Sequence, residues 1–153
     1  MDGVILRSVT VENWKECIEL QVHHDQKDFV PSNLYSIAEA QFYPRAVSLA
    51  IYNDQGQMVG FTMYGVDETS GKWKIFRIMI DQAHQGKGSG RAAMEAVIEQ
   101  LAGRPDCDEI LIAYKPTNEA ARELYAHFGF AEQGVRDGLA RARLDLEKGQ
   151  DGS

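Results

Sequence analysis

Residues 78–91 read IMIDQAHQGKGSGR, an apolar run followed by a loop with glycine at positions 86, 88 and 90. Glycine adopts positive φ angles at little steric cost and lets a ligand approach the backbone closely. A helix is expected from about residue 88, and the first turn of a helix offers unpaired N–H groups at a positive dipole end. The stretch therefore predicts a strand, a loop that binds phosphate or pyrophosphate, and a helix.

Two other glycine loops do not match this stretch. A P-loop requires G-x-x-x-x-G-K-[ST], which is not present. A dinucleotide fingerprint requires G-x-G-x-x-G in an early βαβ unit, whereas these glycines follow several predicted strands. The alternative interpretation is a solvated glycine-rich turn. Residues 72–91 include five basic residues and one acidic residue, so positive charge is expected around the loop. The basic residues are Lys72, Lys74, Arg77, Lys87 and Arg91, and the acidic residue is Asp81.

The rest of the chain alternates between strand-like and helix-like segments. Strands are expected at residues 5–8, 46–52, 58–65, 72–80, 109–113, 130–135 and 139–146. The first helix is expected from residue 10 or 12 to about 24. The second begins after a cap at Ser32 or Asn33 and runs through residue 40. The third is expected at 88–101, and the fourth at 117–128 with a cap at Thr117 or Asn118. Early strands form an antiparallel meander, and the later strand-helix-strand unit requires a parallel crossover. The prediction is an α/β (α+β) fold: a mixed, mostly antiparallel sheet of about seven strands, flanked by four helices.

Length and composition fit one compact domain. The chain has 153 residues, 44% of them apolar, and we expect a single domain over residues 1–146 with a disordered tail at 147–153. The net charge of −7 argues against a nucleic-acid or membrane binder. Cys17 and Cys107 lie far apart and outside any metal-binding pattern, which predicts no metal and a reducing cytoplasmic location. No signal peptide or membrane span is expected.

A second motif covers residues 118–130, NEAARELYAHFGF. Apolar residues at helical spacing indicate an amphipathic helix that ends at Gly129. Core packing explains Leu124 and Phe128. Tyr125 fits core packing too, but its helix follows the strand beside the glycine loop, which would bring the phenol near the reactive end of a ligand.

These two motifs together resemble the GNAT superfamily of N-acetyltransferases. The resemblance rests on Gln85-x-x-Gly88-x-Gly90, Asn118 and Leu124-Tyr125-x-x-x-Gly129-Phe130, and extends over nearly the whole chain through the order of elements. More narrowly, residues 26–40, 61–65, 76–81 and 85–88 resemble bacterial spermine/spermidine (diamine) N-acetyltransferases.

The resemblance implies acetyl-CoA as cosubstrate, no metal, and a primary amine such as spermine or spermidine as acceptor. It implies that Tyr125 is the general acid and that Asn118 lies beside the pantetheine. The strand would hold the pantetheine and present an N–H to the acetyl carbonyl through Ile78, Met79 and Ile80. The pyrophosphate would be cradled by Gln85, Gly86, Lys87, Gly88, Ser89, Gly90 and Arg91.

The general base is not identified by the motifs. Some relatives carry a carboxylate on the strand before the loop, where this chain has Lys74, Phe76 and Arg77. An acceptor cation needs carboxylates to bind it, and the candidates are Asp25, Asp28 and Glu39; His23 and His24 are further candidates for the base.

Other functions remain open on the sequence alone. The acceptor is alternatively a peptide N-terminus, an amino acid or an aminoglycoside. The chain is alternatively a non-catalytic CoA-binding regulator or a nucleotide-binding module. The edge of the final hairpin, residues 130–146, suggests a homodimer.

Overall fold

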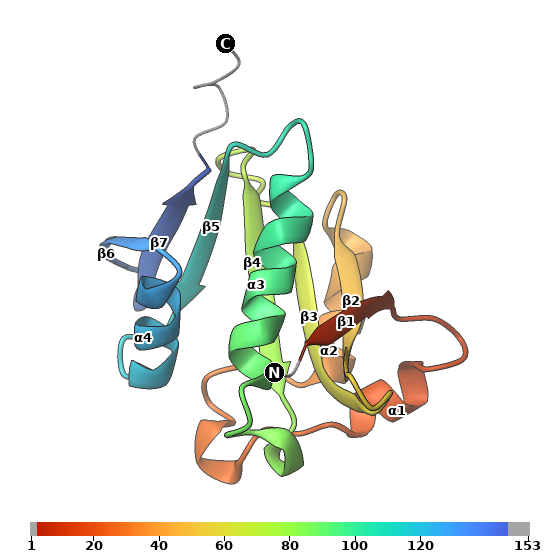
Figure 1. The fold of residues 1–153 in the computed structure, drawn as a ribbon. Helices are drawn as coiled ribbons and strands as arrows, with labels where there is room; N and C mark the ends of the chain where they lie inside the picture. Colours follow the sequence, from red (N-terminus) through yellow and green to blue (C-terminus); the bar gives the residue numbers. More distant parts are fainter. Residues whose placement is uncertain (1–2, 147–153) are drawn as a thin grey trace.

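The computed structural model describes residues 3–146, so the predicted tail at 147–153 lies outside the described residues. Seven strands form one sheet in the order β1-β2-β3-β4-β5-β7-β6 (Figure 1). The strands are β1 (Val4–Ser8), β2 (Val47–Asn53), β3 (Met58–Val66), β4 (Trp73–Ile80), β5 (Glu109–Tyr114), β6 (Ala131–Arg136) and β7 (Leu139–Asp145). The helices are α1 (Trp14–Glu19), α2 (Asn33–Glu39), α3 (Ser89–Ala102) and α4 (Glu119–His127). This confirms the predicted fold class and element order.

Neighbouring strands in this sheet are antiparallel, except for the parallel pair β4 and β5. The crossover between those two strands is α3, as the strand-helix-strand pattern predicted. The last hairpin turns at Asp137 and Gly138, which both take positive φ angles of 56° and 78°. Positive φ at both central residues is what a tight two-residue hairpin requires.

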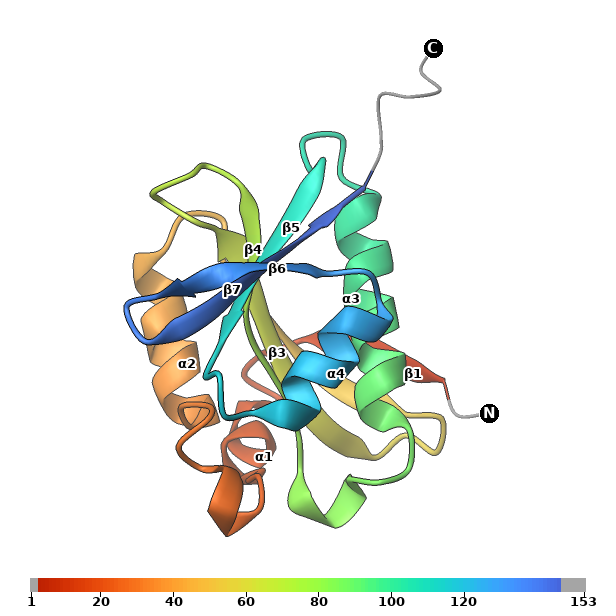
Figure 2. The ribbon, with the colours of Figure 1, turned by 90° about the vertical axis from the view of Figure 1, so that its left-hand side faces the viewer.

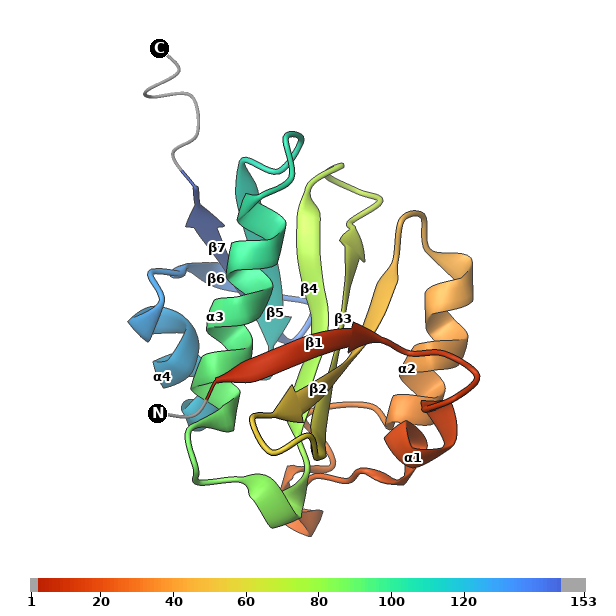
Figure 3. The ribbon, with the colours of Figure 1, turned by 45° about the vertical axis from the view of Figure 1, so that its right-hand side comes forward.

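The helices cover the two faces of the sheet in pairs (Figures 2 and 3). On one face, Met94, Val97 and Leu101 of α3 pack with Tyr125 of α4 in a core with strand residues such as Ile110. On the other face, Cys17 of α1 packs with strand residues, and part of α2 packs against the same cluster. Side chains alternate along β4, so this strand contributes residues to the cores on both faces of the sheet.

β4 and β5 are paired over a short length and then separate. Their register covers Trp73, Lys74 and Ile75, and no pair follows in the described chain. At this point the register between β3 and β4 skips Phe76, because Tyr64 pairs with Ile75 and Met63 with Arg77. An extra residue of this kind bends a strand and increases its twist. The bulge therefore lies where the sheet opens between its two parallel strands.

The first predicted helix was wrong at its C-terminal end, because α1 stops at Glu19 and not near residue 24. Leu20 is extended, and the Gln21 N–H donates to the carboxylate of Asp81 at 2.8 Å. The Gln21 carbonyl accepts from the N–H of Gln82 at 2.7 Å. Bonds to the segment after β4 thus replace the helical bonds at residue 21. At α4, Asn118 is the cap, because its side chain accepts from the N–H of Ala121.

Replacing Gly60 with alanine tests how closely β3 must approach β4. A Cβ at Gly60 would overlap the Met79 carbonyl oxygen and lie 2.9 Å from Ile80 Cδ1. Overpacking of this kind costs about 1–3 kcal/mol, so Gly60→Ala should lower the free energy of unfolding by about that much in a urea titration. Gly3→Ala is the control, because nothing lies within 4 Å of its added Cβ. Equal stability of the two variants would contradict the close approach.

Candidate functional site

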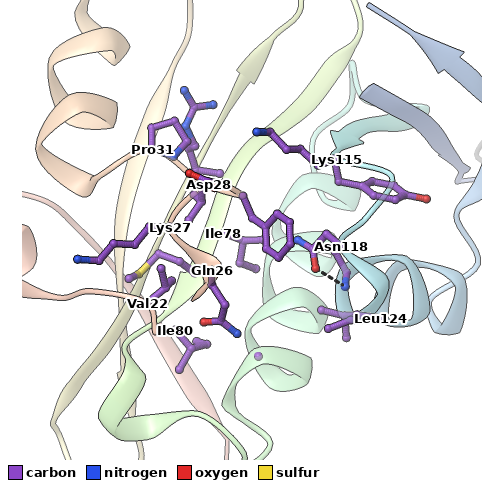
Figure 4. Close-up of a pocket in the computed structure, with 18 of the residues that line it drawn as sticks. Val22, Gln26, Lys27, Asp28, Pro31, Ile78, Ile80, Lys115, Asn118 and Leu124 are labelled. Atoms are coloured by element: carbon purple, nitrogen blue, oxygen red, sulfur yellow. Dashed lines mark hydrogen bonds between the residues drawn. The ribbon is translucent and has the colours of Figure 1, made fainter. Parts of the chain in front are cut away.

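A pocket of about 760 Å³ opens where β4 and β5 separate (Figure 4). Its walls are β4, the start of α4, the residues after β5, and the segment between α1 and α2, residues 20–32, which we call the strap. Figure 4 shows Gln26 and Asp28 of the strap on one side and Lys115 and Asn118 on the other, with Ile78 between them. The volume is within the range of small-molecule sites.

The glycine loop presents free backbone donors at one end of this pocket. Gly86 and Gly88 have φ angles of 79° and 88°, and Gly88 is the N-cap of α3 without a capping side chain. Among the described residues, no N–H of residues 86–91 donates a hydrogen bond; the first helical bond runs from Ala92 to Gly88 at 3.0 Å. Successive unpaired amides at a helix N-terminus form an anion site.

The loop glycines have unequal roles. Gly86 and Gly88 take left-handed conformations, which residues with a Cβ adopt only at a steric cost. Gly90 does not have a positive φ angle, and its added Cβ would lie 3.7 Å from Ile80, an ordinary contact. The backbone angles therefore require glycine at positions 86 and 88, and not at position 90.

The side chain of Gln85 is engaged within the protein. It donates to the Ile80 carbonyl at 2.9 Å and to the Gln26 side-chain oxygen at 2.9 Å, and its own oxygen accepts from Gln26. These bonds tie the glycine loop to the end of β4 and to the strap. Gln85 thus holds the loop in place, and its side-chain amide is not free for a ligand.

Beyond Ile75, the edge of β4 that faces β5 has no strand partner in the described chain. Ile78, Met79 and Ile80 line the pocket along this stretch. Ile78 and Ile80 pack toward the face covered by α3, while Met79 packs toward the face covered by α1 and α2. The exposed edge therefore offers backbone groups to an extended ligand.

Tyr125 lies in the opposite wall with its ring buried between Tyr114 and Phe130. Its side chain lines the pocket, and its hydroxyl makes no hydrogen bond to the described residues. Burial, with a smaller contribution from Tyr114, raises the pKa of Tyr125 to about 12. The phenol is thus a protonated donor at neutral pH. Asn118 lies in the same wall and uses its side-chain oxygen to cap α4.

The three candidate acids do not lie together. Asp28 of the strap lines the pocket, whereas Asp25 and Glu39 are not among its lining residues. Glu39 instead pairs with Arg77 at 2.5 Å and accepts from the hydroxyl of Tyr43 at 3.0 Å. His23 and His24, the further candidates for the base, also lie outside the lining.

The predicted gathering of positive charge around the loop is wrong for two residues. Lys72 pairs with Asp108 and Glu109 at the opposite end of β4, and Arg77 pairs with Glu39. Lys87 in the loop and Arg91 in the first turn of α3 are exposed.

Two further cations, Lys27 and Lys115, line the pocket, and the sequence analysis missed them. Lys115 follows the C-terminal end of a parallel strand, where ligands bind in open α/β sheets, so that signal was available. Lys27 carries no comparable signal, because the path of the strap depends on tertiary contacts.

Among the described residues, Cys17 is not available for covalent catalysis, and no group of side chains is placed to hold a metal. Burial, then the charge of Glu16, raise the pKa of Cys17 to about 12, so this thiol is not an available nucleophile. Residues 3–146 contain no group of three or more His, Cys, Asp or Glu side chains placed to hold a metal. No helix among them is long and apolar enough to cross a membrane.

Comparisons with known proteins identify relatives along most of the chain. The model of the acetyltransferase (GNAT) family matches residues 10–130. The spermine/spermidine N(1)-acetyltransferase of Bacillus subtilis (strain 168) is 30% identical over 141 residues, covering 88% of this chain and 92% of the relative.

Solved structures show the same fold. A spermidine N-acetyltransferase from Vibrio cholerae, in complex with CoA and spermine, has a TM-score of 0.75 at 17% identity and covers 95% and 97% of the two chains. The ribosomal-protein-S18-alanine N-acetyltransferase from Escherichia coli has a TM-score of 0.74 at 21% identity and covers 100% and 99%. Because the family model spans most of the sequence and the relative covers nearly all of it, the chain belongs to the acetyltransferase (GNAT) family.

Proposed function

We propose that this acetyltransferase moves an acetyl group from acetyl-CoA to a primary amine, with a polyamine such as spermine or spermidine as acceptor. The observation that carries the proposal is the set of unpaired amides at residues 86–91, at one end of a pocket that continues along β4 to Tyr125. Acetyl-CoA would supply a diphosphate for the amides and an activated thioester for the reaction.

The residues present fit this donor. Backbone N–H groups at a helix N-terminus suit the diphosphate, and the left-handed Gly86 and Gly88 shape the loop. The unpaired edge of β4 at residues 78–80 suits the amide-containing pantetheine arm. Lys27 and Lys115 add positive charge to the pocket wall, which favours a polyanionic donor.

The acceptor must lose a proton before it reacts. An alkyl amine with a pKa near 10.4, like that of lysine, is almost fully protonated at pH 7. Asp28 is the carboxylate among the described lining residues, so it is placed to attract the ammonium and to receive its proton, directly or through water. A Cys17 thiol with a raised pKa offers no acyl acceptor, which favours direct attack by the amine.

Tyr125 has the properties of a general acid. A thiol leaving group has a pKa near 8.5, judged from cysteine, so a thiolate that forms needs a nearby proton donor. Tyr125 stays protonated across the physiological range, and its hydroxyl is not engaged by other described residues. An N–H on β4 near Met79 would complete the site by donating to the carbonyl oxygen as negative charge develops.

Relatives support the polyamine acceptor, because the B. subtilis protein is named for spermine and spermidine. The charges of the pocket favour a second candidate. With Arg77 paired to Glu39, the lining cations Lys27 and Lys115 stand against one lining carboxylate, Asp28. This balance suits an acceptor that carries a carboxylate beside its amine, such as an amino acid or a peptide.

The glycine loop gives the first test of donor binding. Gly88→Ala should weaken CoA binding about tenfold or more in calorimetry, because alanine disfavours the left-handed angle by roughly 1–2 kcal/mol. Gly90→Ala is the matched control and should bind within about twofold of wild type, since its Cβ meets only an ordinary contact. Equal loss in both variants, or in neither, would count against the loop as the diphosphate site.

Removal of the Tyr125 hydroxyl tests the general acid. Tyr125→Phe should lower kcat by about 10²–10⁴-fold, while the Kd for acetyl-CoA changes little. Because the pKa of Tyr125 is raised to about 12, wild-type kcat should show no decline due to this group between pH 7 and 10. The measurement is kcat against pH for both enzymes. Wild-type rates in the variant would remove Tyr125 from the mechanism.

Asp28 is tested with a panel of amines. Asp28→Asn should raise the KM for spermidine or lower kcat about tenfold or more, because the variant loses the carboxylate in the pocket. Asp25→Asn, a similar change at an exposed position outside the lining, is the control and should behave like wild type. Turnover of amino acids or peptides with none of spermidine would reject the polyamine in favour of the second candidate.

A further inference from the structure

A second cavity of about 340 Å³ lies beside the main pocket. The two share a common wall, made by Val22, Lys27, Val30, Pro31 and Met79. The other lining residues of the second cavity come from the end of α1, the strap and the start of α2: Ile18, Leu20, Gln21, Ser32 and Asn33. We call this space the side cavity. It has no role in the acetyl transfer described above.

The lining of the side cavity suits an uncharged chain. Ile18, Leu20, Val22, Val30 and Met79 make most of it apolar. Lys27 also lines it, in the wall shared with the main pocket, and none of its described lining residues is a carboxylate. Burying an ammonium there would cost free energy without a paired anion.

Two polar side chains of the side cavity, Ser32 and Asn33, are engaged within the protein. Asn33 donates to the Cys17 carbonyl at 2.8 Å, and the Ser32 side chain accepts from the N–H of Tyr35. A polyamine tail is therefore not the ligand that this space fits.

Met79 links the side cavity to the reacting group. Its backbone is in the stretch of β4 proposed to hold the thioester, and its side chain packs toward α1 and α2, with Sδ 3.8 Å from Asn33 Nδ2. A methionine side chain is unbranched and adapts its shape readily. A chain that extends from the acetyl carbon past Met79 would thus enter the side cavity.

We infer that the enzyme also transfers acyl groups longer than acetyl, with the tail of a propionyl or butyryl group in the side cavity. This inference rests on the proposed function. The bonds change as for acetyl: the amine nitrogen bonds to the acyl carbonyl carbon, the C–S bond breaks, the ammonium proton leaves to the base, and the thiolate gains a proton. The reaction needs no further reactant.

The test compares acetyl-, propionyl- and butyryl-CoA with one amine acceptor. Butyryl-CoA should have a kcat/KM within about tenfold of that for acetyl-CoA, whereas a site closed around a methyl group rejects extra methylenes by about 10–200-fold each. Mass spectrometry of the product identifies the acyl group transferred. Without any amine, butyryl-CoA should raise the melting temperature at least as much as acetyl-CoA does.

Variants that fill the side cavity test whether the acyl tail lies there. Leu20→Trp should lower kcat/KM for butyryl-CoA about tenfold or more while acetyl-CoA changes by less than about threefold, because Leu20 lines only the side cavity. Leu34→Trp is the control, since Leu34 is 54% exposed on α2 outside both cavities. Ile18→Phe is a second filling variant, should Leu20→Trp fold poorly.

Three results would overturn the inference while leaving the acetyltransferase intact. The first is a wild-type kcat/KM for butyryl-CoA more than about tenfold below that for acetyl-CoA. The second is butyryl transfer that both filling variants leave unchanged, and the third is a filling effect seen only with long alkylamine acceptors. Absence of acetyl transfer and of CoA binding would instead reject the proposed function itself.

Discussion

The separation of β4 from β5 is the constraint on which the site depends. If β4 and β5 stayed paired along their whole length, ladder hydrogen bonds would occupy the backbone edge of β4. No cleft would then form in the sheet. The pairing stops at Ile75, where Phe76 is skipped in the register with β3. Beyond that point the same edge faces a pocket. The bulge thus converts backbone groups that would support the sheet into groups that can bind a ligand.

The two motifs lie at different walls of this opening. The glycine loop leads from β4 into α3 and presents unpaired amides, so its contribution is mainly backbone chemistry. The helix after β5 presents side chains, with Tyr125 held by aromatic neighbours and Asn118 at the helix start. Binding of an anion and proton donation are therefore assigned to separate elements, which meet only because both strands open toward the same space.

The strap completes the site and is held by polar bonds at its start and in its middle. Gln21 bonds to the segment after β4, and Gln26 exchanges bonds with Gln85 next to the glycine loop. The strap thereby places Asp28 and Lys27 at the main pocket, with the side cavity beyond it. In the two proposals, the residues that select the amine and the acyl group belong to this segment more than to the two motifs.

The local sequence determined the strands, three of the four helices and the glycine loop, because hydrophobic period, caps and turn residues act over a few positions. Ser32 before α2 and Asp137-Gly138 in the last turn are examples in which the local signal and the structure agree. The sequence also placed Tyr125 in the helix after β5, and in the structure this residue lines the pocket. The early end of α1 was not predictable in this way, because bonds between Gln21 and residues 81 and 82 replace helical bonds. Only the tertiary structure decided which charges surround the pocket: Glu39 pairs with Arg77, while Asp28 and Lys115, distant in sequence, line the same pocket from opposite sides. The physical reason is that pairing partners of surface charges and the path of a strap are set by contacts between segments, which no short pattern encodes.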